Sequence, residues 1–261
     1  MIIVENATKW KIAILICALI FLITSLQLGP IAAPKITITN DTRVQSEEVE
    51  YFENAKGFFA RPVLDGTYPG VIMIHERWGL NSNIRDMARQ LASFGYNVLA
   101  VDLYQGNVAS TSDEATQLVA ELNQTLAIDN MKAARQFLKE KGSPVFASLG
   151  WGFGGGQSLQ LALSGEPIDA TVIYYGSLAD DLSAIKKPVL GFFGGKDTTI
   201  PITSINAFES KLNELNVTNE IHVYPSAGGA FANPTGSGYA PQETEDAWIR
   251  TLDFLNKYLR S

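Results

Sequence analysis

Residues 145–163 read V-F-A-S-L-G-W-G-F-G-G-G-Q-S-L-Q-L-A-L. An apolar run, a glycine-rich turn and a helix-like segment follow one another, which predicts a strand, a sharp turn and a helix. This is the context of a nucleophile elbow, Gly-x-nucleophile-x-Gly, which exposes a reactive side chain at the turn. Here the pattern reads Gly150-Trp151-Gly152-Phe153-Gly154. Because Gly152 has no side chain, the sequence predicts an elbow without its nucleophile.

Strand-like and helix-like segments alternate on both sides of the elbow. Strands are predicted at 71–75, 97–101, 145–149, 171–175, 188–193 and 220–224, after a hairpin formed by 49–52 and 58–63. Helices are predicted at 83–94, capped by Asn81 or Ser82, at 112–141 in two pieces, at 203–215 and at 243–259. This alternation predicts an α/β fold, with a mainly parallel sheet and helices on both faces.

Composition limits the kind of protein. A chain of 261 residues with 46% hydrophobic residues can bury the core of one domain. The net charge of −7 argues against a nucleic-acid partner. A single cysteine, Cys17, excludes an intrachain disulfide, and two histidines argue against a metal site. We therefore expect no metal and no cofactor.

The N-terminus carries a long apolar run, residues 12–28, preceded by Lys9 and Lys11. Its length as a helix approaches the ~30 Å hydrocarbon core of a membrane. A cleaved signal peptide and an uncleaved anchor both fit, and the length favours the anchor. We expect a cytoplasmic stub and signal anchor over 1–34, a polar tether over 35–48 and a domain over 49–261. The lysines place that domain outside the cytoplasm, secreted if the segment is cleaved.

An α/β-hydrolase triad follows the chain order nucleophile, acid, histidine. Asp197 fits the acid position, after the predicted strand 188–193. The histidine position falls in the loop 225–231, P-S-A-G-G-A-F, which contains no histidine. The sequence therefore retains one triad position of three.

Five segments together resemble the dienelactone hydrolase (carboxymethylenebutenolidase) family. They are Gly70–Asn81, Asp102–Tyr104, the elbow, Gly194–Asp197 and Tyr224–Pro234, and the resemblance covers nearly all of 48–261. It implies an α/β-hydrolase fold with a Cys-His-Asp triad that acts on lactones or esters.

The resemblance assigns roles residue by residue. The family cysteine falls on Gly152, the acid on Asp197 and the histidine on Gly229. Glu76 matches the glutamate beside the resting cysteine. The implied oxyanion donors are the backbone N–H groups of Arg77 and Phe153, which survive side-chain changes because the backbone supplies them.

The pocket should have aromatic walls and no arginine clamp. The expected wall residues are Trp78, Tyr104, Trp151 and Phe231. No arginine directly follows Tyr104, and Asn233 stands where some family members place arginine. Acidic dienelactones are therefore not the expected substrates.

Two functions compete on these residues. The first is a membrane-anchored pseudoenzyme, with a small-molecule ligand or a membrane-protein partner. The second is an active ester or lactone hydrolase, in which Glu76 or Asp197 activates water. A third interpretation is a spacer or assembly partner. The remaining candidates are interpreted as structural: Ser148, Ser158, Ser226, His75 and His222.

Overall fold

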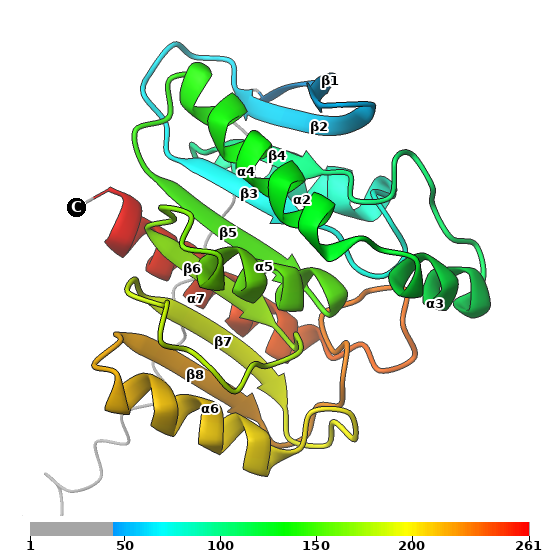
Figure 1. The fold of residues 1–261 in the computed structure, drawn as a ribbon, viewed down its shortest axis with the longest axis vertical. Coiled ribbons are helices and arrows are strands. Elements are labelled where there is room, and N and C mark those ends of the chain that lie inside the picture. Colours follow the sequence, from blue (N-terminus) through cyan, green and yellow to red (C-terminus); the bar gives the residue numbers. More distant parts are fainter. Residues whose placement is uncertain (1–43, 261) are drawn as a thin grey trace, which may run out of the picture. The chain divides into compact units, whose positions relative to one another are not determined.

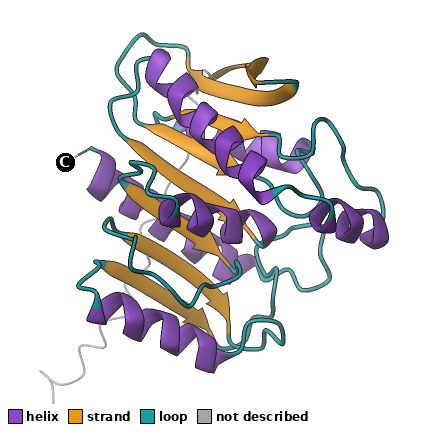
Figure 2. Cartoon of the chain, viewed as in Figure 1, coloured by secondary structure: helices purple, strands orange, loops and turns teal. Residues whose placement is uncertain are grey.

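The computed structural model describes residues 44–260, so the predicted membrane segment lies outside the described residues. Eight strands of the described chain form one sheet (Figures 1 and 2). They are β1 (Val44–Phe52), β2 (Ala55–Pro62), β3 (Gly70–Ile74), β4 (Asn97–Val101), β5 (Phe146–Trp151), β6 (Ala170–Tyr174), β7 (Val189–Gly194) and β8 (Asn219–Tyr224).

The sheet is mainly parallel, as predicted. Its strand order is β1-β2-β4-β3-β5-β6-β7-β8. Strands β3 to β8 pair in parallel, whereas β2 pairs antiparallel with β1 and β4. Parallel neighbours need crossover connections, which helices mostly supply. The helices are α2 (Ser82–Ser93), α3 (Ser112–Ala120), α4 (Gln124–Glu140), α5 (Phe153–Leu163), α6 (Ile202–Glu214) and α7 (Pro241–Leu259).

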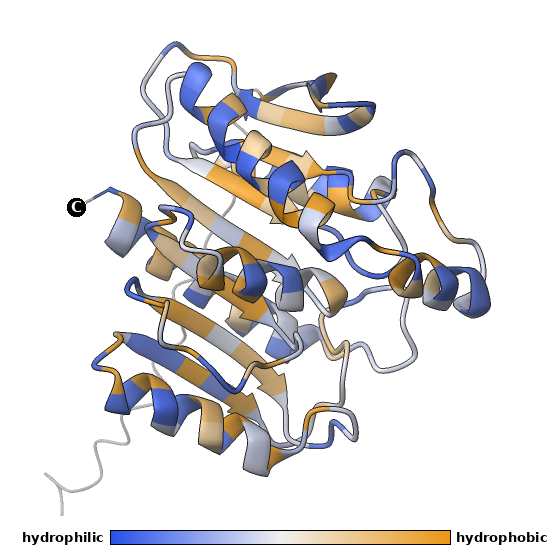
Figure 3. Ribbon diagram, viewed as in Figure 1, coloured by the Kyte–Doolittle hydropathy of each residue, from blue (hydrophilic) through white to orange (hydrophobic). Residues whose placement is uncertain are grey.

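Helices cover both faces of the sheet because its central strands are apolar on both sides. Val71 and Met73 of β3 pack in the core shared with α2 and α7, and Ile72 and Ile74 pack in the core beneath α4. Helices α5 and α6 pack on the same face of the sheet as α4, and α7 packs on the other face (Figure 1). Figure 3 shows the result, with apolar strands inside and hydrophilic helix faces outside.

The predicted elements are confirmed in place and type. The Asn81 side chain caps α2, accepting the N–H of Ile84 at 3.2 Å. The predicted helix over 112–141 is divided into α3 and α4, and Asn123 caps α4. The predicted hairpin is β1 and β2.

The predicted boundary between tether and domain needs correction. We expected a tether up to residue 48, but β1 begins at Val44, which pairs with Pro62 of β2. All four residues from 45 to 48 are polar and exposed, because β1 is an edge strand. The backbone hydrogen bonds to β2, rather than burial of side chains, hold β1 in place. Its sequence therefore lacks the apolar alternation that predicts a strand.

None of the helices between residues 44 and 260 combines the length and the apolar composition that crossing a membrane requires.

Candidate functional site

The elbow has the predicted backbone. Gly152 is the N-cap residue of α5, with φ +53° and ψ −114°. This is a region that residues with a Cβ enter at a cost of roughly 1–3 kcal/mol. A Cβ built on Gly152 would meet nothing closer than ring atoms of Tyr175 at 3.9 Å. The space for a nucleophile therefore remains, although the side chain is absent.

The acid position and the histidine position lie against each other. A Cβ built on Gly229 would lie 2.8 Å from Oδ2 of Asp197. The other oxygen, Oδ1, accepts the N–H groups of Thr199 at 2.7 Å and Ile200 at 3.2 Å. The Asp197 carboxylate thus occupies the space next to Gly229 and is held there by the turn after β7.

These positions surround one cavity of about 360 Å³, called here the elbow cavity. It lies at the carboxyl ends of the parallel strands, where open α/β sheets bind ligands. Its lining includes the predicted residues Glu76, Arg77, Trp78, Gly152, Phe153 and Gly229, and also Tyr175, Asn233 and Ser237. Asp197 touches Gly229 from outside the lining.

The predicted oxyanion donors lie at this cavity. Arg77 and Phe153 both line it. Phe153 opens α5, whose first N–H groups have no partner within the helix and no side-chain cap. The positive end of the helix dipole therefore faces the cavity, as an oxygen atom of a ligand requires.

Glu76 is a buried carboxyl group at the wall of the elbow cavity. It is 8% exposed, and its Oε2 accepts Nδ2–H of Asn233 at 2.8 Å. Burial raises the pKa of Glu76 from an ordinary 4.5 to about 7, against the lowering charge of Arg77. The Arg77 guanidinium stacks on Trp78 and donates to Ser112, so it does not neutralise Glu76 directly. Glu76 consequently changes protonation near neutral pH.

Tyr175 is the site residue that sequence reasoning missed. It follows β6, its φ is +37°, and its buried hydroxyl lies near Glu76 without a well-formed hydrogen bond to any described residue. Burial and the Glu76 charge raise the pKa of the Tyr175 phenol well above its ordinary value. The available signal was its place at the carboxyl end of a parallel strand.

Three of the four predicted wall residues lie outside the lining of the elbow cavity. Phe231 is fully buried, packed between Tyr175 and Tyr224. Tyr104 lines a different cavity beside β4. Trp151 borders a void of about 20 Å³ next to Glu76 and Asn233. Of the four aromatic residues, only Trp78 lines the elbow cavity, because the others point into the sheet core or away from it.

The alternative nucleophiles and bases are engaged in the structure. Ser148 and Ser158 are fully buried and their hydroxyls pair at 2.8 Å. Ser226 donates to Glu243 at 2.7 Å. His75 is fully buried, and burial lowers its pKa to about 4, so the ring is neutral. Its Nε2 accepts the N–H of Leu103 at 3.2 Å, which makes it a structural histidine.

His222 lies on the edge strand β8, stacked on Phe192. It lines none of the cavities described here. Burial lowers its pKa as well. It therefore does not replace the histidine missing at Gly229.

Comparisons with known proteins agree with this geometry. The model of the dienelactone hydrolase family matches residues 55–259. A protein of Saccharolobus solfataricus, provisionally described as a carboxymethylenebutenolidase, is 32% identical, over 80% of this chain and 98% of its own. The protein usf of Aquifex pyrophilus is 32% identical, over 81% of this chain and 98% of its own. The crystal structure of a provisionally assigned dienelactone hydrolase from Klebsiella pneumoniae has a TM-score of 0.75 at 28% identity, covering 83% of this chain and all of that one.

The sheet order, the crossover helices and the elbow define an α/β-hydrolase. Within that class, this chain belongs to the dienelactone hydrolase family.

Proposed function

We propose that this protein is a pseudoenzyme of the dienelactone hydrolase family that binds a small molecule in the elbow cavity and is anchored to a membrane by residues 12–28. One observation carries the proposal. An open cavity lined by Arg77 and Phe153 remains around Gly152 and Gly229, the two glycines at the positions expected for nucleophile and histidine.

The geometry supports binding without triad chemistry. Ser237 supplies a hydroxyl to the cavity lining, but no imidazole stands among the described lining residues to activate it. Loss of triad members leaves roughly 10³–10⁴-fold acceleration over water from the oxyanion hole and binding alone. With Asp197 against Gly229, the acid has no ring to orient.

The lining indicates what kind of molecule fits. Free N–H groups at the start of α5 favour an oxygen acceptor. Trp78 offers an aromatic face, and the volume of about 360 Å³ suits a small molecule. A charged ligand carboxylate would meet Glu76, which is half ionised near pH 7. A neutral carbonyl compound, such as a lactone or ester, is therefore the proposed ligand.

The test restores the triad in the full chain by the double change Gly152→Cys and Gly229→His. A side chain at position 152 has room, and an imidazole at position 229 requires the Asp197 carboxylate to rotate away from 2.8 Å. We expect the natural chain to bind but not to hydrolyse p-nitrophenyl acetate and a neutral lactone. The double variant should turn them over, and each single variant should not.

The control is the double variant with Asp197→Asn added, which should lose the restored activity. Hydrolysis by the natural chain at a rate comparable to that of the double variant would contradict the pseudoenzyme proposal.

A second function is favoured by one specific observation at Glu76. The void of about 20 Å³ beside this carboxyl group is large enough for one water molecule, with Asn233 at its border. A carboxylate with a pKa of about 7 is suited to take a proton from water near neutral pH. Asp197 is less suited, because its Oδ1 is held by two backbone N–H groups.

A hydrolase of this kind would become more active as pH rises through about 7, since only ionised Glu76 acts as a base. Glu76→Gln would abolish its activity at every pH. A flat pH profile of any measured hydrolysis, or full activity of Glu76→Gln, would exclude this second function.

A further inference from the structure

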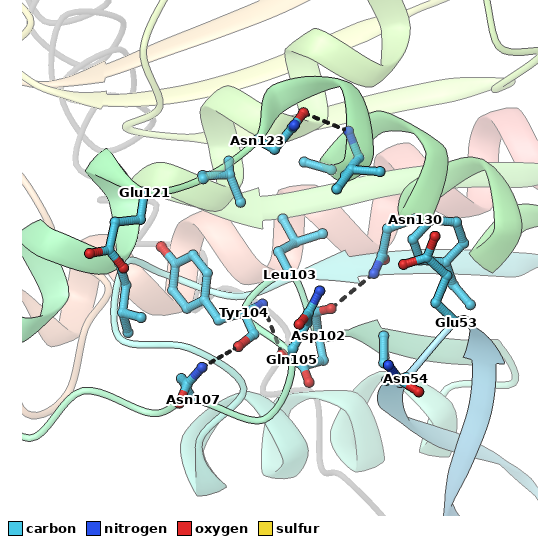
Figure 4. Close-up of a pocket in the computed structure, with 16 residues that line it drawn as sticks. Glu53, Asn54, Asp102, Leu103, Tyr104, Gln105, Asn107, Glu121, Asn123 and Asn130 are labelled. Atoms are coloured by element: carbon cyan, nitrogen blue, oxygen red, sulfur yellow. Dashed lines mark hydrogen bonds between the residues drawn. The ribbon is translucent and has the colours of Figure 1, made fainter.

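A second cavity, called here the β4 cavity, lies away from the elbow (Figure 4). Its volume is about 300 Å³. Four segments enclose it: the turn between β1 and β2, the loop 102–107 after β4, the last turn of α3 and the first turns of α4. The β4 cavity is therefore formed by its own set of segments at the carboxyl end of β4, and the carboxyl ends of strands commonly bind ligands.

An aromatic cluster separates the β4 cavity from the elbow cavity. Tyr104 lines the β4 cavity, and Phe153 lines the elbow cavity. Their ring centroids lie 5.5 Å apart, and His75 packs on both rings. The two cavities share no lining residue, so a ligand in one does not occupy the other.

The charge of the β4 cavity is negative. Its lining carries the carboxyl groups of Glu53, Asp102 and Glu121, and none of the described residues that line it is a lysine, arginine or histidine. Asp102 is 2% exposed; burial raises its pKa, while the backbone N–H groups of Tyr104 and Gly106 and the charge of Arg85 lower it. The cavity therefore repels anions and favours a positive charge.

The helix that begins at this cavity offers no anion site either. The side chain of Asn123 accepts the N–H groups of Thr125 and Leu126, at 3.0 and 3.2 Å. The first turn of α4 is thus already capped, and its positive dipole end is shielded from a ligand.

Tyr104 provides a second, independent observation. It is 5% exposed, and its hydroxyl has no hydrogen-bond partner in the part of the chain that the structure describes. In Figure 4 its ring extends from the loop after β4 towards the side on which Glu121 lies. A phenol oxygen accepts hydrogen bonds from an ammonium group, and an aromatic face attracts a cation.

Part of the lining is aliphatic. Leu118, Leu122 and Leu126 come from α3, the following link and α4, and all three line the cavity. Leu126 is 42% exposed, so burial under a ligand would remove apolar surface from water. The cavity thus combines carboxyl groups with apolar side chains in one lining.

We propose that the β4 cavity binds a small aliphatic ammonium compound, with its cationic head beside Tyr104 and the carboxyl groups and its hydrocarbon body on the leucines. The site does not depend on the proposed function of the elbow cavity, because no residue is shared.

The experiment titrates the full chain, in a non-ionic detergent at pH 7.5 and low salt, with n-butylammonium. Calorimetry and the side-chain amide signals of asparagine and glutamine report binding. Sodium butyrate is the probe of the same length and opposite charge, and 1-butanol is the neutral probe. The test variant combines Glu53→Gln with Glu121→Gln, two exposed changes that keep shape and remove charge. The matched control combines Glu209→Gln with Glu245→Gln, which changes net charge equally outside the cavity.

We expect n-butylammonium to bind, with an affinity at least tenfold above that of butyrate and butanol. The affinity of the Glu53→Gln, Glu121→Gln variant for n-butylammonium should be at least tenfold lower than that of the natural chain. The affinity of the control variant should fall less than twofold. Equal affinity for butylammonium and butyrate would overturn the proposal. Equal loss in both double variants, or no binding at 100 mM, would overturn it as well.

Discussion

At the residue scale, Glu76 is the group with the largest consequence for pH. Its pKa is about 7 in the folded chain and about 4.5 when exposed. The folded state therefore binds this proton more tightly than the unfolded state, and stability falls as pH rises from about 4.5 to about 7. Above pH 7 the buried charge is present and its full cost remains.

Glu76→Gln should remove this pH dependence. Gln keeps an oxygen that accepts from Asn233, but it carries no charge. Relative to the natural chain, we expect the free energy of unfolding of the variant to gain about 3 kcal/mol between pH 4 and pH 8, since one pH unit corresponds to about 1.4 kcal/mol. Urea unfolding at both pH values measures it.

The control for this prediction is Glu245→Gln on α7, an exposed position. It should leave the difference between the two pH values unchanged. If the stability of Glu76→Gln relative to the natural chain were the same at pH 4 and pH 8, the proposed titration of Glu76 would be wrong.

At the element scale, the packing of α5 on the sheet depends on glycine. A Cβ on Gly154 would lie 2.4 Å from the carbonyl oxygens of Ile74 and His75. These are backbone atoms at the end of β3 and cannot rotate away. Gly156, two residues further along α5, would place its Cβ 3.4 Å from the nearest atom, which is ordinary contact. The same helix therefore contains a glycine that does not tolerate a side chain, Gly154, and one that does, Gly156.

Gly154→Ala should lower the free energy of unfolding by about 3 kcal/mol or more, because the helix must move off the sheet. Gly156→Ala, the matched control, should be neutral or gain up to about 1 kcal/mol from helix propensity. Urea titrations followed by circular dichroism compare the two. Similar stabilities of both variants would show that β3 and α5 do not approach as closely as described.

At the scale of the whole molecule, the proposed attachment to a membrane rests on residues 12–28. Arginine near the centre of a spanning helix costs about 2.5–3.5 kcal/mol on insertion scales. Leu19→Arg with Phe21→Arg should therefore shift the full chain from the membrane pellet to the supernatant after an alkaline wash. The control variant carries two arginines in the predicted tether, Thr37→Arg with Thr39→Arg. This variant should stay in the membrane pellet.

Recovery of the natural chain in the supernatant would contradict the anchor. A mass lower by about the weight of the first 33 residues would instead indicate cleavage and release. Both readings concern the N-terminal segment alone and leave the elbow cavity and the β4 cavity as they are.

The sequence by itself determined the order of the elements and the state of the triad. Hydrophobic periodicity, capping residues and turn residues are local properties of the sequence. The strand before Gly152, the cap at Asn81 and the division of the helix into two pieces could therefore be predicted from neighbouring residues. The absence of a side chain was equally readable at Gly152 and Gly229, the positions that the family resemblance assigns to the nucleophile and the histidine. The edge strand β1 was partly missed, since its ladder with β2 left little apolar pattern.

Only the tertiary structure decided what surrounds these positions. It brought Tyr175 and Asn233 to Glu76 from distant parts of the chain, and burial there moved the pKa of Glu76 to about 7. It also placed Tyr104 in a separate acidic cavity, away from the elbow. The physical reason is that cavities, burial and carboxyl pKa values arise from how sheet ends and loops pack. That packing brings together residues more than 100 positions apart, such as Glu76 and Asn233. A local sequence pattern does not predict such contacts.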